Sequence, residues 1–171
     1  MTQSRDKHVR LFEGWLNHHG AIIAKSARLH CENLAESDDL RQEMLLQLWR
    51  SVSGFDGRCG ESTWIYRVCL NTALTWKRKA GRRNRKEQAG KEHMLGDADL
   101  RSQGTGATEE KIERLYAAVR KLPAVDRNLI QLSLDGLSYR EIAEVTGLTE
   151  SGIGSRLTRA RQQLANLIEK E

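Results

Sequence analysis

Cationic and aromatic side chains gather in one segment of this 171-residue chain. Seven of the ten residues from position 77 to position 86 are Lys or Arg, and they follow a stretch that contains Trp64, Tyr66 and Trp76. Aromatic rings stack on unpaired bases while cations contact phosphates, so this combination is typical of binding to single-stranded nucleic acid. Core packing of the tryptophans and a solvated basic helix end are the alternatives, and the residue pattern leaves them open.

A second group of polar residues lies near the C-terminus. Residues 138–141 have the pattern of a capping box, Gly147 suits a left-handed turn, and a helix is predicted from 149 to about 169. This order is that of a helix-turn-helix, whose second helix enters the major groove of DNA. The residues expected on its exposed face are polar or charged: Glu150, Ser151, Ser155, Arg156, Arg159 and Arg161. A helical hairpin that binds another protein is the alternative.

Residue types that serve catalysis or metal binding form no recognisable pattern in the sequence. The five histidines have no metal-ligand spacing, and neither a phosphate-binding loop nor a nucleophile elbow is present. The cysteines Cys31, Cys59 and Cys69 are odd in number and include no CxxC pair, which disfavours a disulfide framework or zinc site. We therefore expect neither an enzyme nor a cofactor or metal. Cys69 is predicted to be core and the other two incidental, with a redox sensor as the alternative.

The elements that must position these residues are predicted to be helices. Apolar residues recur at spacings of three and four within residues 40–52, 65–76, 112–122 and 153–167, and strand-like alternation is nearly absent. The fold class is therefore all-α. We predict two small helical domains, 1–86 and 109–171, joined at 87–108 by a polar, glycine-containing flexible linker.

Hydropathy predicts a cytoplasmic protein without membrane insertion. No apolar run in the sequence approaches the roughly 20 residues of a membrane-spanning helix. The first residues, MTQSRDKHVR, lack the apolar core of a signal peptide.

Three segments together resemble the bacterial extracytoplasmic-function (ECF) sigma factors. The helix that binds the RNA polymerase clamp in that family is similar to DDLRQEMLLQLWR. The stretch that melts and reads the minus-ten promoter element is similar to FDGRCGESTWIYRVCLNTALTWKRK. The helix-turn-helix that reads the minus-thirty-five element is similar to LPAVDRNLIQLSLDGLSYREIAEVTGLTESGIGSRLTRARQQL. They occur in the family's order and cover about residues 20–80 and 109–168.

The resemblance implies a role for individual residues. The residues that the resemblance assigns to polymerase binding are Asp39, Leu40, Gln42 and Glu43. Contacts with single-stranded minus-ten DNA fall to Phe55, Asp56, Gly57, Trp64, Arg67, Asn71, Trp76 and Arg78. Contacts with the minus-thirty-five duplex fall to Tyr139, Arg140, Thr149, Ser151, Ser155, Arg156 and Arg159. The implied partners are core RNA polymerase, promoter DNA and an anti-sigma factor.

The sequence departs from the family pattern at a few positions. Thr75 stands where Asp is usual, and Gly154 stands where Lys is common, which removes a cation within reach of a phosphate. The loop residues Arg58-Cys59-Gly60 are also unusual for the family. These departures concern promoter sequence and affinity more than the class of protein. The main alternative is a stand-alone transcription regulator, which would bind duplex DNA without polymerase.

Overall fold

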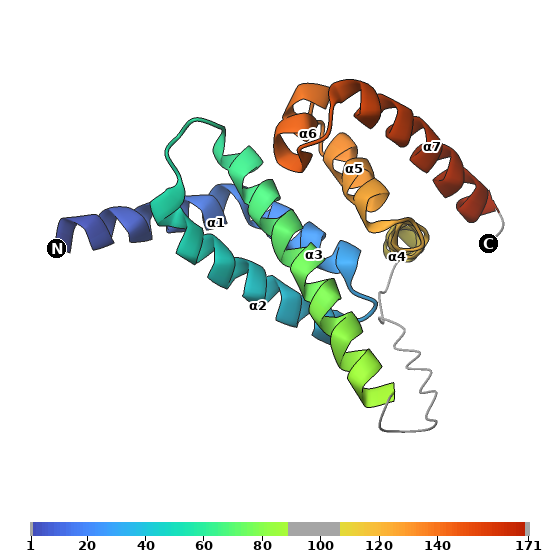
Figure 1. Cartoon of the computed structure of the whole chain (residues 1–171), viewed down its shortest axis with the longest axis horizontal. Coiled ribbons are helices and arrows are strands. Elements are labelled where there is room, and N and C mark those ends of the chain that lie inside the picture. Colours follow the sequence, from blue (N-terminus) through green and yellow to red (C-terminus); the bar gives the residue numbers. More distant parts are fainter. Residues whose placement is uncertain (1, 89–106, 170–171) are drawn as a thin grey trace.

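The computed structural model of the protein describes the backbone of residues 2–88 and 107–169, and the side chains of residues 5–80 and 110–169. Three long helices form the N-terminal half: α1 (Thr2–His30), α2 (Leu34–Ser51) and α3 (Glu61–Gln88), with a 3-10 turn at Val52–Gly54. The C-terminal half contains α4 (Ala107–Arg120), α5 (Ala124–Leu134), α6 (Tyr139–Thr146) and α7 (Glu150–Glu169). The described residues contain no strand, and the all-α prediction is confirmed (Figure 1).

Most of the predicted linker, residues 89–106, lies outside the described residues. At its two edges the helices run further than expected, because α3 ends at Gln88 and α4 begins at Ala107. The side chains of Arg82, Arg83, Arg85 and Lys86 also lie outside the described part, so the basic block is seen only at its beginning.

The N-terminal half has a core made where its three helices meet. Trp15 of α1, Met44 and Leu48 of α2, and Ile65 of α3 are fully buried there. Burial of large apolar side chains is the main favourable term in folding, so this cluster holds the three helices together. Asn33 caps α2, since its Oδ1 accepts a hydrogen bond of 2.8 Å from the Glu36 backbone N–H.

The C-terminal half follows the predicted helix-turn-helix closely. Ser138 and Glu141 form the expected capping box, in which the Glu141 N–H donates to Ser138 Oγ at 3.3 Å and the Ser138 N–H donates to Glu141 Oε2 at 2.7 Å. Gly147 ends α6 with φ +74°, and Thr149 Oγ1 accepts from the Gly152 N–H at 3.3 Å at the start of α7. The turn between α6 and α7 is therefore determined by its own residues.

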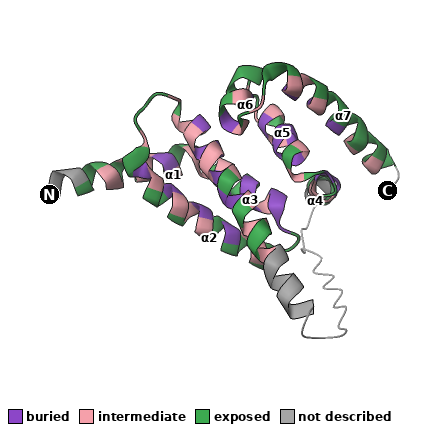
Figure 2. Cartoon of the chain, viewed as in Figure 1, coloured by how far each residue is buried: buried purple, intermediate pink, exposed green. Residues whose placement is uncertain are grey.

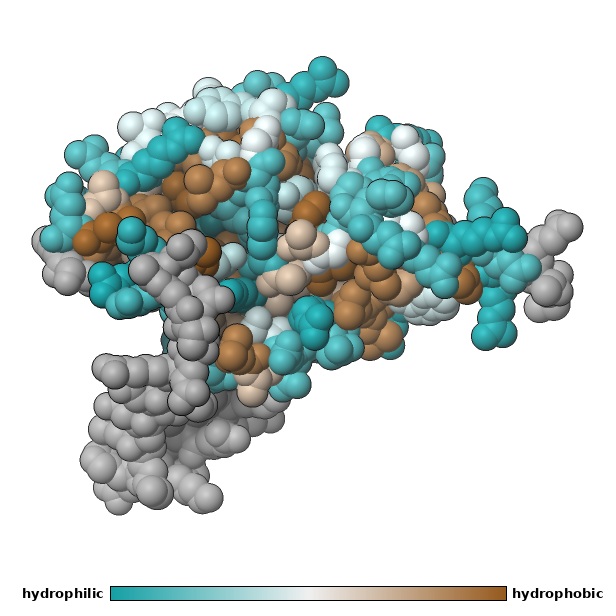
Figure 3. Space-filling model, turned by 180° about the vertical axis from the view of Figure 1, so that it is seen from behind, coloured by the Kyte–Doolittle hydropathy of each residue, from teal (hydrophilic) through white to brown (hydrophobic). Residues whose placement is uncertain are grey.

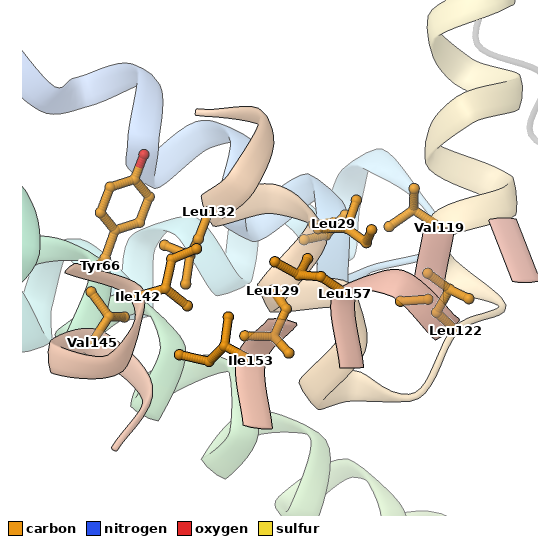
Figure 4. Close-up of a cluster of buried hydrophobic side chains, with 12 residues drawn as sticks. Leu29, Tyr66, Val119, Leu122, Leu129, Leu132, Ile142, Val145, Ile153 and Leu157 are labelled. Carbon is orange, nitrogen blue, oxygen red and sulfur yellow. The ribbon is translucent and has the colours of Figure 1, made fainter. Parts of the chain in front are cut away.

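The two halves pack against each other through α1 and α3. A second buried cluster contains Leu29 of α1 and Tyr66 of α3 together with residues of α4 to α7. In Figure 4, Tyr66 lies beside Ile142 and Val145 of α6, while Leu29 lies toward α4. Figure 2 shows buried residues on the facing sides of α3, α5 and α6. The chain is thus folded in a closed arrangement, with one apolar cluster shared between its halves.

Two glycines allow a prediction about backbone conformation. Gly147→Ala is expected to lower the free energy of unfolding by about 1–2 kcal/mol, because φ +74° places Cβ against the following carbonyl oxygen. Gly14→Ala is the matched control: Gly14 lies within α1, and an added Cβ meets nothing within 4 Å. It is expected to raise stability by roughly 0.5–1 kcal/mol. Urea denaturation of both variants measures the difference, and shifts of the same sign would contradict it.

Candidate nucleic-acid interface

The outer face of α2 carries the acidic and amide side chains that the sequence singles out. Asp39 and Gln42 are exposed, and half-buried Glu43 accepts a hydrogen bond of 2.8 Å from Gln47 Nε2. Leu40 was expected to contact polymerase, but its side chain is fully buried. It packs in the core with α1 and α3 and positions this face without contributing to its surface.

The loop before α3 is anchored by an aromatic stack. The Phe55 ring lies edge-on to Trp15 of α1, with 5.4 Å between centroids, and to Trp64 of α3, with 5.6 Å. Trp64 Nε1 donates to Ser51 Oγ at 3.1 Å. Edge-to-face pairs and a satisfied indole N–H are the features of packed aromatics, so Phe55 and Trp64 serve the loop's position in this conformation.

The tip of that loop is open to solvent. Asp56, Gly57 and Arg58 are exposed, and Gly57 has φ +76°. Asp56 Oδ1 accepts a hydrogen bond of 3.1 Å from the Arg58 N–H, which makes a local turn. The polar atoms of the tip are therefore presented beyond the aromatic anchor.

A groove between α2 and α3 joins two of the predicted residue sets. Its volume is about 340 Å³. Asn71 is exposed at this groove, Trp76 is half-buried, and Arg78 lies further along α3, where it donates to Thr75 Oγ1 at 3.1 Å. The lining consists of Glu43, Gln47, Ser51, Val68, Asn71, Thr72, Thr75, Trp76 and Lys79. The groove brings amide, hydroxyl, aromatic and cationic groups together beside the Glu43 carboxylate, and aromatic and cationic groups are those that bind single-stranded nucleic acid.

Arg67 of α3 differs from the rest of the minus-ten set because the C-terminal half holds it. Its guanidinium donates to the backbone carbonyl of Glu144 at the end of α6, at 2.7 Å. This contact crosses between the halves, so Arg67 is engaged by the protein itself in the closed arrangement.

The exposed face of α7 agrees with the prediction at most positions. Ser151, Ser155 and Arg159 are exposed, as are Thr149 before the helix and Arg140 on α6. Ser155 Oγ donates to the Ser151 carbonyl at 3.2 Å, which leaves the hydroxyl oxygen able to accept. Hydroxyl and guanidinium groups at the start of such a helix suit phosphates and base edges.

Arg156 and Tyr139 are not free on the surface, because each contacts a neighbouring helix. Arg156 was expected on the exposed face, but it is half-buried, and its Nε donates to Asp126 Oδ1 of α5 at 2.9 Å. It therefore ties α7 to α5. Tyr139 is 42% exposed, and its ring lies so close to α7 that a Cβ on Gly154 would meet Tyr139 Cε2 at 3.4 Å. A side chain at position 154 would thus lie in direct contact with this tyrosine ring.

Arg127 is a buried charged residue to which the sequence interpretation gave no role. Its Nη2 donates to the carbonyls of Arg120 at 2.6 Å and Leu122 at 3.0 Å, at the end of α4, and its Nη1 donates to the Leu29 carbonyl at 3.3 Å. Backbone carbonyls at a helix end lack partners within the helix, and Arg127 satisfies them. The sequence offered one signal for this buried role, which is that the arginine stands among apolar residues in the stretch LPAVDRNLIQL.

Two of the cysteines are buried and keep their thiols protonated. Cys31 and Cys69 are both in the N-terminal core, and burial raises the pKa of each thiol to about 12. Since the thiolate is the reactive form, neither is suited to redox sensing in this arrangement. Cys31 was expected to be incidental, so its burial corrects that interpretation. Cys59 is half-buried in the loop before α3.

Across the described ranges, no three His, Cys, Asp or Glu side chains are grouped so as to hold a metal ion. Over the same ranges, none of the helices is both long enough and apolar enough to cross a bilayer.

Apolar residues also reach the surface of the C-terminal half. Ile112 and Leu115 of α4 and Ile168 of α7 are between 37% and 50% exposed. Figure 3, seen from behind, shows hydrophobic surface gathered where α4 and the end of α7 lie. A gathered apolar surface of this kind is typical of a protein-binding site.

Family models match both halves of the chain. The model described as Sigma-70 region 2 matches residues 15–83, and that described as Sigma-70, region 4 matches residues 112–164. The ECF RNA polymerase sigma-E factor of Haemophilus influenzae is 32% identical over 143 residues, which cover 77% of this chain and 74% of the relative. The chain belongs to the ECF sigma factors. The sigma-E factor of Escherichia coli K12 is 29% identical over 139 residues, 77% of this chain and 73% of that one.

Solved structures have the same fold. The sigma factor RpoE of Bartonella quintana, solved with the anti-sigma factor NepR, gives a TM-score of 0.72 at 22% identity, over 92% of this chain and 96% of that one. CnrH, solved with the cytosolic domain of CnrY, gives 0.70 at 23% identity, over 99% and 95%. At these identities the likeness concerns the fold, and it extends over both halves of this ECF sigma factor.

Proposed function

We propose that this ECF sigma factor binds core RNA polymerase through the outer face of α2 and directs it to promoters through α3 and α7. The observation that carries the proposal is that the segments matching regions 2 and 4 present their polar residues outward on three separate helices. Asp39, Gln42 and Glu43 would contact polymerase, with Leu40 supporting them from the core. The chain supplies binding and positioning and no catalytic step, so we assign no enzyme activity and no cofactor to it.

The minus-ten element is assigned to α3 and the loop before it. We infer that Asn71, Trp76 and Arg78 contact the separated strand beside the groove, and that Asp56 and Gly57 present the loop tip to a flipped base. Phe55 and Trp64 would hold the loop in place. Capture of an unpaired base offsets the few kcal/mol that flipping it out of the stack costs. Arg67 can join only after its contact with Glu144 is released.

The minus-thirty-five element is assigned to α7 and its N-terminal turn. We infer that Thr149, Ser151, Ser155 and Arg159 face the major groove, with Tyr139 and Arg140 beside them. Arg156 would act by fixing α7 on α5 through Asp126. The functional division that we propose is 1–86 for polymerase and the minus-ten element, 87–108 as connection, and 109–171 for the minus-thirty-five element.

An anti-sigma factor is the proposed regulator. CnrH and the Bartonella quintana RpoE were solved with CnrY and with an anti-sigma factor, respectively, and both resemble this chain over nearly its whole length. The exposed apolar residues of α4 and α7 supply a surface for such a protein.

Run-off transcription tests the proposal. Core RNA polymerase is combined with this protein on a library of minus-ten and minus-thirty-five sequences, with core alone as the control. Specific initiation that requires the protein is the expected result, because polymerase tethers two individually weak DNA contacts. Tight duplex binding by the protein alone, without initiation, would contradict it and favour a stand-alone regulator.

A further inference from the structure

A buried polar pair joins the two halves at the C-terminal end of α1. His30 Nε2 lies 2.9 Å from Asn128 Oδ1 of α5, and the two residues are only 5% and 6% exposed. Asn128 Nδ2 donates to the Ala124 carbonyl at 2.6 Å, which orients the amide so that its oxygen faces His30. The imidazole Nε2 therefore carries the proton and donates it to Asn128.

The other ring nitrogen of His30 is Nδ1. Nδ1 is buried without a hydrogen bond among the described residues. A cavity of about 10 Å³ lies at the same place, between the halves. Its lining includes uncharged polar residues from both sides: Ser26, Tyr66, Cys69, Asn128 and Gln131. A second proton on the ring would thus meet no hydrogen-bond acceptor among the described residues in this closed arrangement.

The charged side chains that act on His30 are cations. Arg127 of α5 and Lys77 of α3 both disfavour a positive imidazole, and burial disfavours it more strongly than either. Together they lower the His30 pKa to about 4, although the hydrogen bond with Asn128 opposes the shift. Two carboxylates act on these cations: Glu36 of α2 acts on Lys77, and Glu32, after α1, acts on both Lys77 and Arg127.

We propose that His30 is an acid-sensitive latch, in which a proton on its ring opens the contact between the N-terminal and C-terminal halves. Its consequence for transcription rests on the proposed function, because opening would release Arg67 from the Glu144 carbonyl. Opening itself is a property of the chain alone.

The remaining contacts between the halves are of two kinds. One is the apolar cluster in which Leu29 and Tyr66 pack against the C-terminal half. The other is a set of polar pairs: Lys25 with Asp135 at 2.7 Å, Tyr66 Oη to Asp135 at 2.8 Å, and Gln131 Nε2 to Ser26 at 3.0 Å. Water can replace such bonds at little net cost. The N-terminal core contains no residue of the C-terminal half, so it persists when the halves part.

The sign of the pH effect follows from the lowered pKa. In the closed chain the His30 pKa is about 4, whereas a ring exposed by opening has the ordinary value of 6.5. The open form binds the proton more tightly, so closure is fully favoured above pH 6.5 and weakens as pH falls toward 4. The closed-to-open ratio is expected to fall roughly 30-fold between pH 8 and pH 5. The Arg28–Glu113 pair persists at pH 5, because its arginine partners lower the Glu113 pKa.

Small-angle scattering of the full-length protein, without polymerase or DNA, tests the latch. The radius of gyration is expected to rise between pH 8 and pH 5 for the natural chain. His30→Gln keeps a donor toward Asn128 and cannot titrate, so it should remain compact at both pH values. His18→Gln changes an exposed histidine of the same helix and should behave as the natural chain does.

A second variant keeps the test decisive if His30→Gln does not fold, which far-UV circular dichroism checks. Asn128→Asp places a carboxylate beside the protonated ring and should keep the chain compact at pH 5. A constant radius of gyration for the natural chain, or equal expansion of Asn128→Asp, would overturn the latch. Because opening is measured on the chain alone, a failure here is distinct from a failure of promoter recognition.

Discussion

Replacing Asn71 by alanine is expected to reduce promoter-specific run-off transcription by about 10- to 100-fold. A side chain that reads a base edge contributes about 1–3 kcal/mol of discrimination, and Asn71 is exposed at the groove where α3 meets α2. Removing its amide deletes no buried contact, so the free energy of unfolding should change by less than about 0.5 kcal/mol. Run-off transcription together with urea denaturation separates these two effects.

Asn17→Ala provides the matched control for Asn71→Ala. Asn17 is also exposed on a long helix, but it lies on α1, away from the groove lining. It should transcribe at the rate of the natural chain. Equal transcription by both variants would remove Asn71 from the interface.

Arg127→Met is expected to cost about 3 kcal/mol of unfolding free energy. The substitution keeps an unbranched side chain but removes the donors that satisfy the Arg120 and Leu122 carbonyls at the end of α4. Hydrogen bonds from charged groups contribute about 1.5–3 kcal/mol each, and buried carbonyls left without a partner add a desolvation cost. A methionine in the same volume recovers part of this through apolar packing. Urea denaturation followed by far-UV circular dichroism measures the loss.

Arg114→Met separates the capping role from a general effect of losing a positive charge. Arg114 is exposed on α4, where its Nη2 donates to Glu110 Oε1 one turn earlier at 2.7 Å. Surface pairs of this kind contribute little, so a change under about 0.5 kcal/mol is expected. If the two variants lose similar stability, Arg127 has no special role at the end of α4.

The elements whose signals are local were the ones predictable from sequence. The capping box at Ser138 and the glycine turn at Gly147 appear as expected, because these residues satisfy the backbone of their own helix ends. The first helix was not assigned from its periodicity, although Trp15 and Ile23 prove central to the core. Its buried positions lie on two sides of the helix, since Trp15, Ile23 and Ala27 belong to the N-terminal core while Leu29 belongs to the cluster shared with the C-terminal half.

The sequence predicted which helix faces of the candidate interface are exposed. It did not predict which individual side chains have partners on other helices. Amphipathic spacing places Asp39, Gln42 and Ser155 outward, and they are exposed. Arg156 and Arg67 have partners on other helices, Asp126 and the Glu144 carbonyl, which only the tertiary arrangement brings near. The role of Arg127 was hidden for the same reason, because its acceptors lie on α4 and on α1.

The apolar cluster shared between the halves has a consequence for biosynthesis. A ribosome releases the N-terminal end first, so α1 and α3 emerge while the helices that cover Leu29 and Tyr66 have not yet been made. During that interval the nascent chain displays an apolar strip that favours self-association. The polar groups along it, Ser26, Lys25 and the Tyr66 hydroxyl, keep the strip hydrated until α5 arrives and takes them as partners.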